Sequence, residues 1–228
     1  MKICGLFSGG KDSTYALFKA IQAGHEIVCL LTIRAERDDS YMYQVSNIEL
    51  TELGAEAMDL PLVVEYSTGI KELELSELRT ALTELKSKLG LEGVSTGAIA
   101  SRYQADRIQK ICDDLGLKTF NPHWQRNHEE LLREMLAHDF KIMIHAVAAQ
   151  GLDNDLWLGR ILDNQAVEEL IQLNKKFGVS LIGEGGEFES LVLDCPLFKK
   201  KIEIVEAVKE WKGLRGIYKI KKAILVEK

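Results

Sequence analysis

The sequence predicts an α/β protein, a doubly wound parallel sheet followed by a smaller C-terminal α+β unit. Two observations lead to this prediction. Unbroken apolar runs, typical of parallel strands covered on both faces, recur through the first two thirds of the chain. Segments with the apolar spacing of amphipathic helices separate these runs. The alternation ends near residue 150, so we expect one domain over 1–150 and a second over 151–228.

The elements of the first domain follow from these patterns in order. Strands are expected at 3–7, 27–33, 62–66, 93–96 and 141–147. Helices are expected between them at about 13–23, 45–57, 103–115 and 128–138. A further helix is marked by leucines spaced alternately by three and four residues, namely Leu75, Leu78, Leu82, Leu85 and Leu89.

The C-terminal part has a different pattern. A helix is expected at 165–177, then the glycine-rich acidic loop G-E-G-G-E-F-E-S at 183–190. Two strand-like segments, about 201–211 and 217–227, flank K-G-L-R-G, which is typical of a hairpin turn. We therefore expect a small α+β unit that ends in a β-hairpin.

Composition indicates an ordinary globular protein, with 46% hydrophobic and 28% charged residues in a chain of 228. No uncharged apolar run approaches the ~20 residues of a membrane span, and the N-terminus lacks the features of a secretion signal. We therefore expect a cytoplasmic protein with no membrane partner. The net charge is −6, yet residues 199–228 carry ten Lys or Arg and four Asp or Glu. This basic segment is either a solvated tail or a docking surface for a partner.

The four cysteines give little support for a zinc site or a disulfide framework. They are scattered without a C-x-x-C pair. Cys4, Cys29 and Cys112 lie in apolar runs or on an apolar helix face, where we expect them to be buried.

The segment S-G-G-K-D-S at 8–13 follows a predicted strand and opens a predicted helix. Gly9 and Gly10 let the backbone turn sharply and approach an anion closely. The free N–H groups at the start of the helix would then bind phosphate, with Ser8 and Ser13 adding hydroxyl donors. The sequence therefore predicts a nucleotide-binding loop.

Lys11 and Asp12 distinguish this loop from a P-loop. Gly5, Gly10 and Lys11 occupy P-loop positions, but Asp12 replaces the magnesium-binding hydroxyl. Lys11 adds a positive charge for phosphate, whereas Asp12 would hold Mg²⁺ or cap the helix. We expect Lys11→Ala to abolish turnover and to leave thermal unfolding nearly unchanged.

The loop resembles the signature SGGxDS of the PP-loop ATP pyrophosphatases. The resemblance implies cleavage of ATP between the α- and β-phosphates, transfer of AMP to an oxygen, and displacement of AMP by a nucleophile. The segments 95–117, 121–125 and 183–198 are further similar to the diphthine–ammonia ligase family, over nearly the whole chain. This implies amidation of diphthine on translation elongation factor 2, with ATP and Mg²⁺, consuming ammonium and releasing AMP and pyrophosphate.

The ATP site is expected at the carboxyl ends of the parallel strands. We place Thr32, Gly97 and Ala98 there beside the loop at 8–13, since small residues let a nucleotide lie against the backbone. Four residues that follow directly could touch phosphate or substrate: Ser101, Arg102, Tyr103 and Gln104. Arg102 and Gln104 could instead be ordinary polar residues of a first helical turn.

Glu184, Glu187 and Glu189 are predicted to be catalytic, with Gly185 and Gly186 binding substrate. Structural loops rarely concentrate like charges in this way, because repulsion raises their energy. The carboxylates could bind ammonium, accept its proton, attract the trimethylammonium of diphthine, or hold Mg²⁺. Their individual roles stay open.

His123 and Trp124 are predicted near the substrate, although Trp124 could simply pack. His145, in a buried strand, is expected to be a core histidine. Arg160 could stabilise charge on the adenylate or pair with a nearby aspartate. The segment D-D-S-Y-M-Y at 38–43 follows a strand end and could cover the site.

Two alternatives remain at this point. One is another AMP-forming PP-loop ligase, which thiolates or amidates tRNA; the acidic body and buried cysteines count against it. The other is an adenine-nucleotide-binding protein without turnover. We expect no stable nucleic-acid partner, and the chain could form a homodimer.

Overall fold

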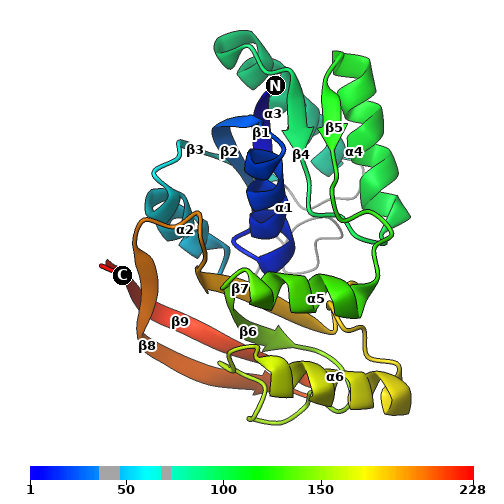
Figure 1. The fold of residues 1–228 in the computed structure, drawn as a ribbon, viewed down its shortest axis with the longest axis vertical. Coiled ribbons are helices and arrows are strands. Elements are labelled where there is room, and N and C mark those ends of the chain that lie inside the picture. The colour runs from blue at the N-terminus through cyan, green and yellow to red at the C-terminus, as the bar shows by residue number, and fades with distance from the viewer. Residues whose placement is uncertain (36–46, 68–72) are drawn as a thin grey trace.

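The computed structural model describes residues 1–35, 47–67 and 73–228 and contains two sheets (Figure 1). One has five strands in the order β3-β2-β1-β4-β5, and the other has four in the order β7-β6-β9-β8. The segment 38–43, considered above as a cover for the site, lies outside the described residues.

The five-stranded sheet is parallel throughout, which confirms the predicted doubly wound fold. Its strands are β1 (Lys2–Leu6), β2 (Glu26–Ala35), β3 (Leu62–Ser67), β4 (Gly93–Ser95) and β5 (Lys118–Phe120).

Helices cover both faces of this sheet, as its apolar strands require. Cys4, Cys29 and Cys112 lie in the core between the sheet and α3 and α4, so their predicted burial is confirmed. The opposite face is covered by α1 and α2. The helices are α1 (Lys11–Gln22), η1 (Ile48–Leu50), α2 (Thr51–Met58), α3 (Leu73–Leu89) and α4 (Arg102–Leu115).

The chain leaves β1 toward β2 on one side and reaches β4 on the other. Strand order therefore reverses beside β1, and in open α/β sheets such a reversal opens a crevice at the carboxyl ends of the strands. The loop between β1 and α1 and the loop between β4 and α4 both lie at that edge.

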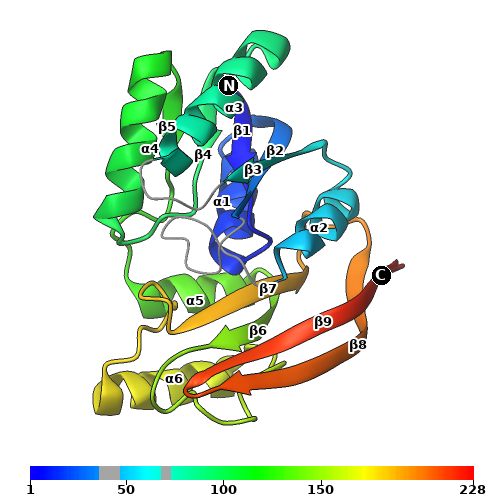
Figure 2. The same cartoon turned by 180° about the vertical axis from the view of Figure 1, so that it is seen from behind.

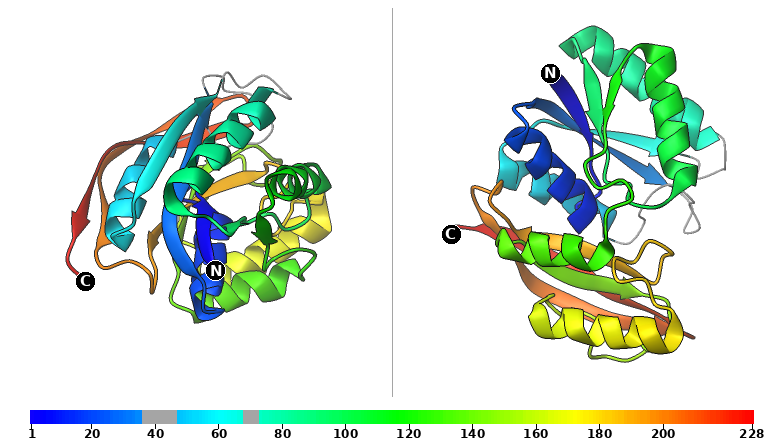
Figure 3. Two further views of the ribbon diagram at one scale, coloured as in Figure 1. Left: turned by 90° about the horizontal axis from the view of Figure 1, so that it is seen from above. Right: turned by 45° about the vertical axis from the view of Figure 1, so that its right-hand side comes forward.

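The second sheet is antiparallel and stands beneath the first in the right-hand view of Figure 3. Helix α1 contacts strands of both sheets, and α2 contacts β8 and β9. Helices α5 and α6 contact each other and pack in the same hydrophobic core as α1 and α2. The elements are α5 (His128–Ala137), β6 (Lys141–Val147), α6 (Asn164–Phe177), β7 (Phe188–Asp194), β8 (Lys201–Lys212) and β9 (Arg215–Val226).

The expectation that 141–147 is a strand of the parallel sheet was wrong. This segment is β6, which pairs antiparallel with β7 and β9 in the second sheet. The reason is that β6 is a central strand whose residues 142–147 are all buried. Burial on both faces gives the same apolar run in either kind of sheet. The chain therefore passes from one sheet to the other after β5, earlier than the residue 150 expected from the sequence.

Asn47, directly before η1, joins the first unit to the second sheet. Its side-chain Nδ2 lies 3.1 Å from Nδ1 of His145 on β6 and donates to the carbonyl of Tyr218 on β9 at 3.1 Å. Its Oδ1 accepts the backbone N–H of Ile220 at 3.1 Å. Asn47 is buried and adopts φ 54°, a left-handed conformation that asparagine tolerates better than most residues.

The free energy of unfolding is expected to fall as the pH drops from about 6.5 to 4. Burial lowers the pKa of His123 and of His145 from 6.5 to about 4. Between these values the unfolded chain binds protons that the folded chain does not, so acid favours unfolding. Each histidine contributes up to about 3 kcal/mol, at roughly 1.4 kcal/mol per pKa unit.

Urea unfolding at pH 7, 6 and 5 measures this dependence. His145→Gln keeps an acceptor for Asn47 but does not titrate. It should therefore reduce the dependence of the free energy of unfolding on pH by about half. A wild-type profile without slope between pH 6.5 and 5 would contradict the prediction.

Candidate active site

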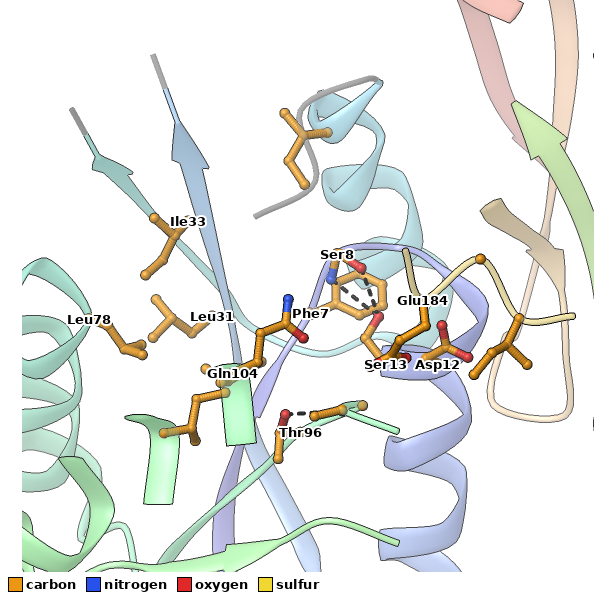
Figure 4. A pocket seen from close by; sticks show the side chains of 17 residues that line it. Phe7, Ser8, Asp12, Ser13, Leu31, Ile33, Leu78, Thr96, Gln104 and Glu184 are labelled. Atoms are coloured by element: carbon orange, nitrogen blue, oxygen red, sulfur yellow. Dashed lines mark hydrogen bonds between the residues drawn. The ribbon is translucent and has the colours of Figure 1, made fainter. Parts of the chain in front are cut away.

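A pocket of about 260 Å³ opens at the carboxyl edge of the parallel sheet, where the strand order reverses. Figure 4 shows the loop after β1, the loop after β4 and Glu184 of the second unit converging on it. Seven residues predicted from the sequence line it: Ser8, Asp12, Ser13, Gly97, Ala98, Gln104 and Glu184.

Gly9 gives the loop after β1 its shape. It has φ 75°, a conformation strained for any residue with a side chain. Its carbonyl accepts the N–H of Val192 on β7 at 2.9 Å, which fixes the loop to the second sheet. Ser8 and Ser13 are joined, because Ser13 Oγ lies 3.2 Å from Ser8 Oγ and accepts the Ser8 N–H at 3.3 Å. Gly10 precedes the first helical residue.

Lys11 is buried, with only 2% of its surface exposed, and does not line the pocket. Its Nζ donates to Asp12 Oδ2 at 2.9 Å and to the carbonyl of Ile182 at 2.5 Å. It also lies 5.2 Å from the centre of the Phe188 ring. The backbone N–H of Lys11 donates to Ser190 Oγ at 3.2 Å. Lys11 therefore connects the loop to the second unit as well as placing a positive charge beside Asp12.

Asp12 lines the pocket, and its two carboxylate oxygens differ. Oδ2 is paired with Lys11, whereas Oδ1 is buried and has no hydrogen-bond partner among the described residues. Burial raises the pKa of Asp12, with a smaller contribution from the nearby charge of Glu184; Lys11 and His128 oppose the rise. An unpaired carboxylate oxygen next to a second carboxylate suits a hard divalent cation such as Mg²⁺.

The loop after β4 packs directly on the start of α1. A Cβ on Gly97 would lie 2.6 Å from the carbonyl carbon of Asp12 and from the nitrogen of Ser13. Only glycine permits this approach. Ala98 follows, and its N–H donates to Thr96 Oγ1 at 3.4 Å.

Thr32 does not line the pocket, although the sequence suggested an ATP contact. It is buried on β2, and its Oγ1 donates to the carbonyl of Phe7 at 2.7 Å. Its neighbours Leu31 and Ile33 line the pocket instead. Thr32 thus holds the strand end that leads into the loop.

The three acidic side chains of the loop at 183–190 lie in different places. Glu184 reaches across to the first unit, where its Oε1 accepts the N–H groups of Ala100 at 2.9 Å and Ser101 at 2.5 Å. Glu187 points back into its own loop. Glu189 lies within β7, opposite Ala146. Of the three, Glu184 alone lines the described pocket.

Glu187 organises the loop. Its Oε1 accepts the N–H of Ser180 at 3.1 Å, and its Oε2 accepts the N–H of Gly185 at 2.8 Å. A Cβ on Gly185 would lie 2.9 Å from Glu187 Oε1, so the two residues are closely packed. Neither Gly185 nor Gly186 lines the pocket.

Glu187→Gln is expected to destabilise the protein by about 1 to 3 kcal/mol. Glutamine turns one acceptor into an NH₂ group that faces a backbone N–H, which leaves that donor unsatisfied. Urea unfolding measures the loss. Glu168→Gln is a suitable control, because Glu168 is 61% exposed in a surface ion pair with Arg133, and a change below about 0.5 kcal/mol is expected. Equal effects of both variants would contradict the role of Glu187.

The residues predicted to bind substrate near α4 are only partly brought together. Gln104 lines the pocket, whereas Ser101 caps α4 by accepting the Gln104 N–H at 3.4 Å. Arg102 is exposed to solvent. The ring of Tyr103 lies 3.6 Å from the Arg107 guanidinium.

His123 and Trp124 do not line the pocket. The His123 ring is fully buried and stacks on Tyr15 of α1, with ring centres 5.3 Å apart. Trp124 is half-buried. Arg160, considered for the adenylate, forms an ion pair with Glu169 at 2.5 Å rather than with a nearby aspartate.

Sequence reasoning missed the apolar wall of the pocket. Leu31, Ile33 and Leu78 lie close together on one side of it in Figure 4, and Ile108 and Ile48 also line the pocket. Their apolar residue types predict only burial, and the apolar spacing along the sequence does not distinguish them from core residues. The one available signal was the position of Leu31 and Ile33 at the carboxyl end of a strand beside the loop.

None of the helices in the described ranges has the length and apolar character that a membrane span requires.

The comparisons with known proteins identify the family of the chain. A model described as the diphthamide synthase N-terminal domain matches residues 1–119, and one for the C-terminal domain matches residues 127–226. The chain is 44% identical over 220 residues to the diphthine–ammonia ligase of Homo sapiens, covering 89% of this chain and 82% of that protein.

More distant relatives carry the same name. The diphthine–ammonia ligase of Danio rerio is 39% identical over 222 residues, covering 90% of this chain and 86% of that protein. That of Saccharomyces cerevisiae is 34% identical over 244 residues, covering 92% of this chain but 35% of that longer protein. A solved structure, described as a predicted subunit of tRNA methyltransferase from Methanocaldococcus jannaschii, reaches a TM-score of 0.46 at 16% identity. The match covers 86% of this chain and 98% of that chain. With both domain models matched and relatives similar along most of its length, the chain belongs to the diphthamide synthase family.

Proposed function

We propose that the protein amidates the carboxylate of diphthine on translation elongation factor 2. ATP activates the carboxylate as an acyl-adenylate, ammonium supplies the nitrogen, and AMP and pyrophosphate are released. The observation that carries this proposal is the meeting of Asp12 and Glu184 in one pocket, beside a glycine-rich loop at the start of a helix. Family membership adds the substrate, which the pocket alone does not identify.

The pocket suits a nucleotide in two respects. Its apolar wall, which includes Leu31, Ile33 and Leu78, provides a surface for an adenine ring. The start of α1 offers backbone N–H groups that have no partner within the helix, and those that follow Lys11, whose own N–H donates to Ser190, are placed to bind phosphate oxygens. Gly97 keeps the loop after β4 against this helix start, so the two binding elements stay in register.

Mg²⁺ fits the carboxylate side of the pocket. Asp12 Oδ1 is the open ligand, and Glu184 lies close enough to act on the pKa of Asp12. When bound, the cation neutralises charge on the departing pyrophosphate. Lys11 holds the other oxygen of Asp12 and thereby sets its orientation.

Glu184 is also placed to act on the nucleophile. Its Oε1 accepts two backbone N–H groups, and the residue lines the pocket, so we assign its second oxygen, Oε2, to the nucleophile. A carboxylate there can hold ammonium close to the activated carbonyl and accept a proton from it. We assign Glu187 to the shape of the loop that presents Glu184, because both of its oxygens bind backbone N–H groups.

Sulfur transfer to tRNA is the less suitable alternative. All four cysteines are buried, and burial raises the pKa of Cys195 to about 12, which disfavours a thiolate nucleophile. Binding of ATP without turnover would give no role to the two carboxylates that meet in the pocket. Because the proposed substrate takes part in translation, we also place the protein in the cytoplasm.

The test uses the purified protein with ATP, Mg²⁺, ammonium and elongation factor 2 that carries diphthine. We expect one AMP per modified factor and a mass change of −1 Da on the modified histidine, as a carboxylic acid becomes an amide. Omission of the factor or of ammonium should suppress AMP formation. Release of ADP, or AMP formation that is indifferent to the factor, would contradict the proposal.

A further inference from the structure

The tip of the β8–β9 hairpin and the loop beside it form an exposed apolar surface. It comprises Leu214, which is 57% exposed, and Trp211, at 38%, on the hairpin, and Leu156, at 76%, on the loop between β6 and α6. Leu156 and Leu214 stand among the most exposed large apolar side chains of the described structure. Together with Lys212 and Arg215 we call the three apolar residues the tip patch. Exposed apolar groups that gather in one place commonly mark an interaction site.

The tip patch is held rigidly. Trp211 Nε1 donates to Asp155 Oδ1 at 2.8 Å, and Lys209 Nζ donates to the Asp155 carbonyl at 2.6 Å. These bonds fix the loop that carries Leu156 to the hairpin. A Cβ on Gly216 would lie 2.6 Å from the Trp211 ring, so the indole packs on bare backbone. A fixed aromatic side chain loses little entropy on binding.

The charges of the tip patch lack a counterpart. Lys212 and Arg215 face each other in the strand ladder, and like charges directly opposite are destabilising. Neither forms an ion pair within the part of the chain that the structure describes. An acidic surface would relieve this repulsion, so charge complementarity points to an acidic partner.

The strand register places the tip patch near the acidic loop that carries Glu184. Gly216 of β9 pairs with Val147 of β6, and Val147 pairs with Phe188 at the start of β7. Phe188 directly follows Glu187, so the tip begins two strands, or about 10 Å, from the acidic loop. Figures 2 and 3 show the hairpin tip and the loop before β7 on the same side of the molecule.

We propose that the tip patch is the surface on which the folded protein substrate docks, through apolar side chains bordered by acidic ones. The proposal rests on the function proposed above, because a ligase that modifies one side chain of a folded protein needs a contact surface next to its pocket. The partner is thus the protein that carries the diphthine side chain, held near Glu184 by contacts outside the pocket.

The test compares two sets of variants with the full-length protein substrate. Leu156→Ser with Leu214→Ser, and Lys212→Glu with Arg215→Glu, should each raise KM for the protein substrate at least about tenfold. The value of kcat at saturation, KM for ATP and Tm should stay as in the wild type. Matched controls lie on the same hairpin about 20 Å away: Val205→Ser, which is 50% exposed, and Lys221→Glu. The controls should leave KM within twofold.

The outcomes separate this proposal from the function itself. No amidation by the wild type would overturn the proposed function. Wild-type turnover with unchanged KM in the tip variants would overturn the docking surface alone. Loss of tRNA binding, measured by fluorescence anisotropy, with unchanged KM for the protein would assign the patch to nucleic acid instead. Conversion of a dimer to a monomer by the tip variants, measured by light scattering, would assign it to a second copy of this chain.

Discussion

Lys11→Met is expected to reduce AMP formation at least about a hundredfold and to lower Tm by about 4 to 8 °C. The loss of activity follows from the charge beside Asp12, since preorganised charges at such sites contribute factors of roughly 10² to 10³. The loss of stability follows from burial, because Lys11 is 2% exposed and bonds to both Asp12 and the Ile182 carbonyl. Breaking a buried pair costs about 3 to 5 kcal/mol.

The cost here should be nearer to about 2 kcal/mol, because the Asp12 side chain is 30% exposed and water stabilises its charge in the variant. For a chain of this size Tm falls by roughly 2 to 4 °C per kcal/mol, so this cost lowers Tm by about 4 to 8 °C. Lys19→Met on the same helix is the control. Lys19 pairs with Glu134 at 3.2 Å near the surface, so Tm should fall by less than about 3 °C with AMP formation unchanged.

Differential scanning calorimetry and an AMP assay on the same preparations decide between the expectations. The sequence led us to expect an unchanged Tm, because it showed Lys11 only as a phosphate ligand. An inactive variant with wild-type Tm would support that first view. Normal turnover with a lowered Tm would leave Lys11 with a structural role alone.

Local sequence order was sufficient for most of the first unit. The loop at 8–13 could be predicted because its serine, glycine and lysine residues in this order are typical of phosphate binding. The strand before it also ends at the carboxyl edge of the sheet, where ligands bind in such folds. The leucine stripe from Leu75 to Leu89 likewise predicted a helix, observed as α3. In both cases the residues that determine the structure lie close together in the sequence.

The second unit was harder to predict because its structure depends on pairing between distant segments. β6 pairs with β7 and β9, which lie roughly 40 to 70 residues away in the chain, and its apolar run fits either type of sheet. β7 was missed because its first residues belong to the acidic run, which suggested a loop. The contact of Glu184 with the N–H groups of Ala100 and Ser101 joins segments that no local pattern relates.

The same limit applies to the site. Asp12, Gly97 and Glu184 could be selected by residue type, and the structure brings all three to one pocket. Thr32 and Glu187 have suitable chemistry but point elsewhere, toward the Phe7 carbonyl and toward their own loop. Side-chain direction is set by register and packing, which residue type does not reveal.

Gly97→Ala tests whether backbone proximity, rather than a side chain, shapes the site. The new Cβ would lie 2.6 Å from the backbone of both Asp12 and Ser13, so the start of α1 must shift away. Displacement of a catalytic element by about 1 Å can cost a factor of roughly 10². We therefore expect kcat/KM for ATP to fall at least about a hundredfold, with a loss of stability of about 1 to 3 kcal/mol.

Gly93→Ala is the matched control, because both glycines sit against backbone on the same segment. A Cβ on Gly93 would lie 2.6 Å from the carbonyl oxygen of Lys118 on β5, at the opposite end of β4 from the pocket. Its stability should fall by a similar amount, while KM for ATP stays within about threefold of the wild type. Measuring both Tm and ATP kinetics separates the two sites. If the variants lost ATP affinity equally, the defect would reflect general loosening of the sheet, and the close packing of Gly97 on α1 would have no special part in nucleotide binding.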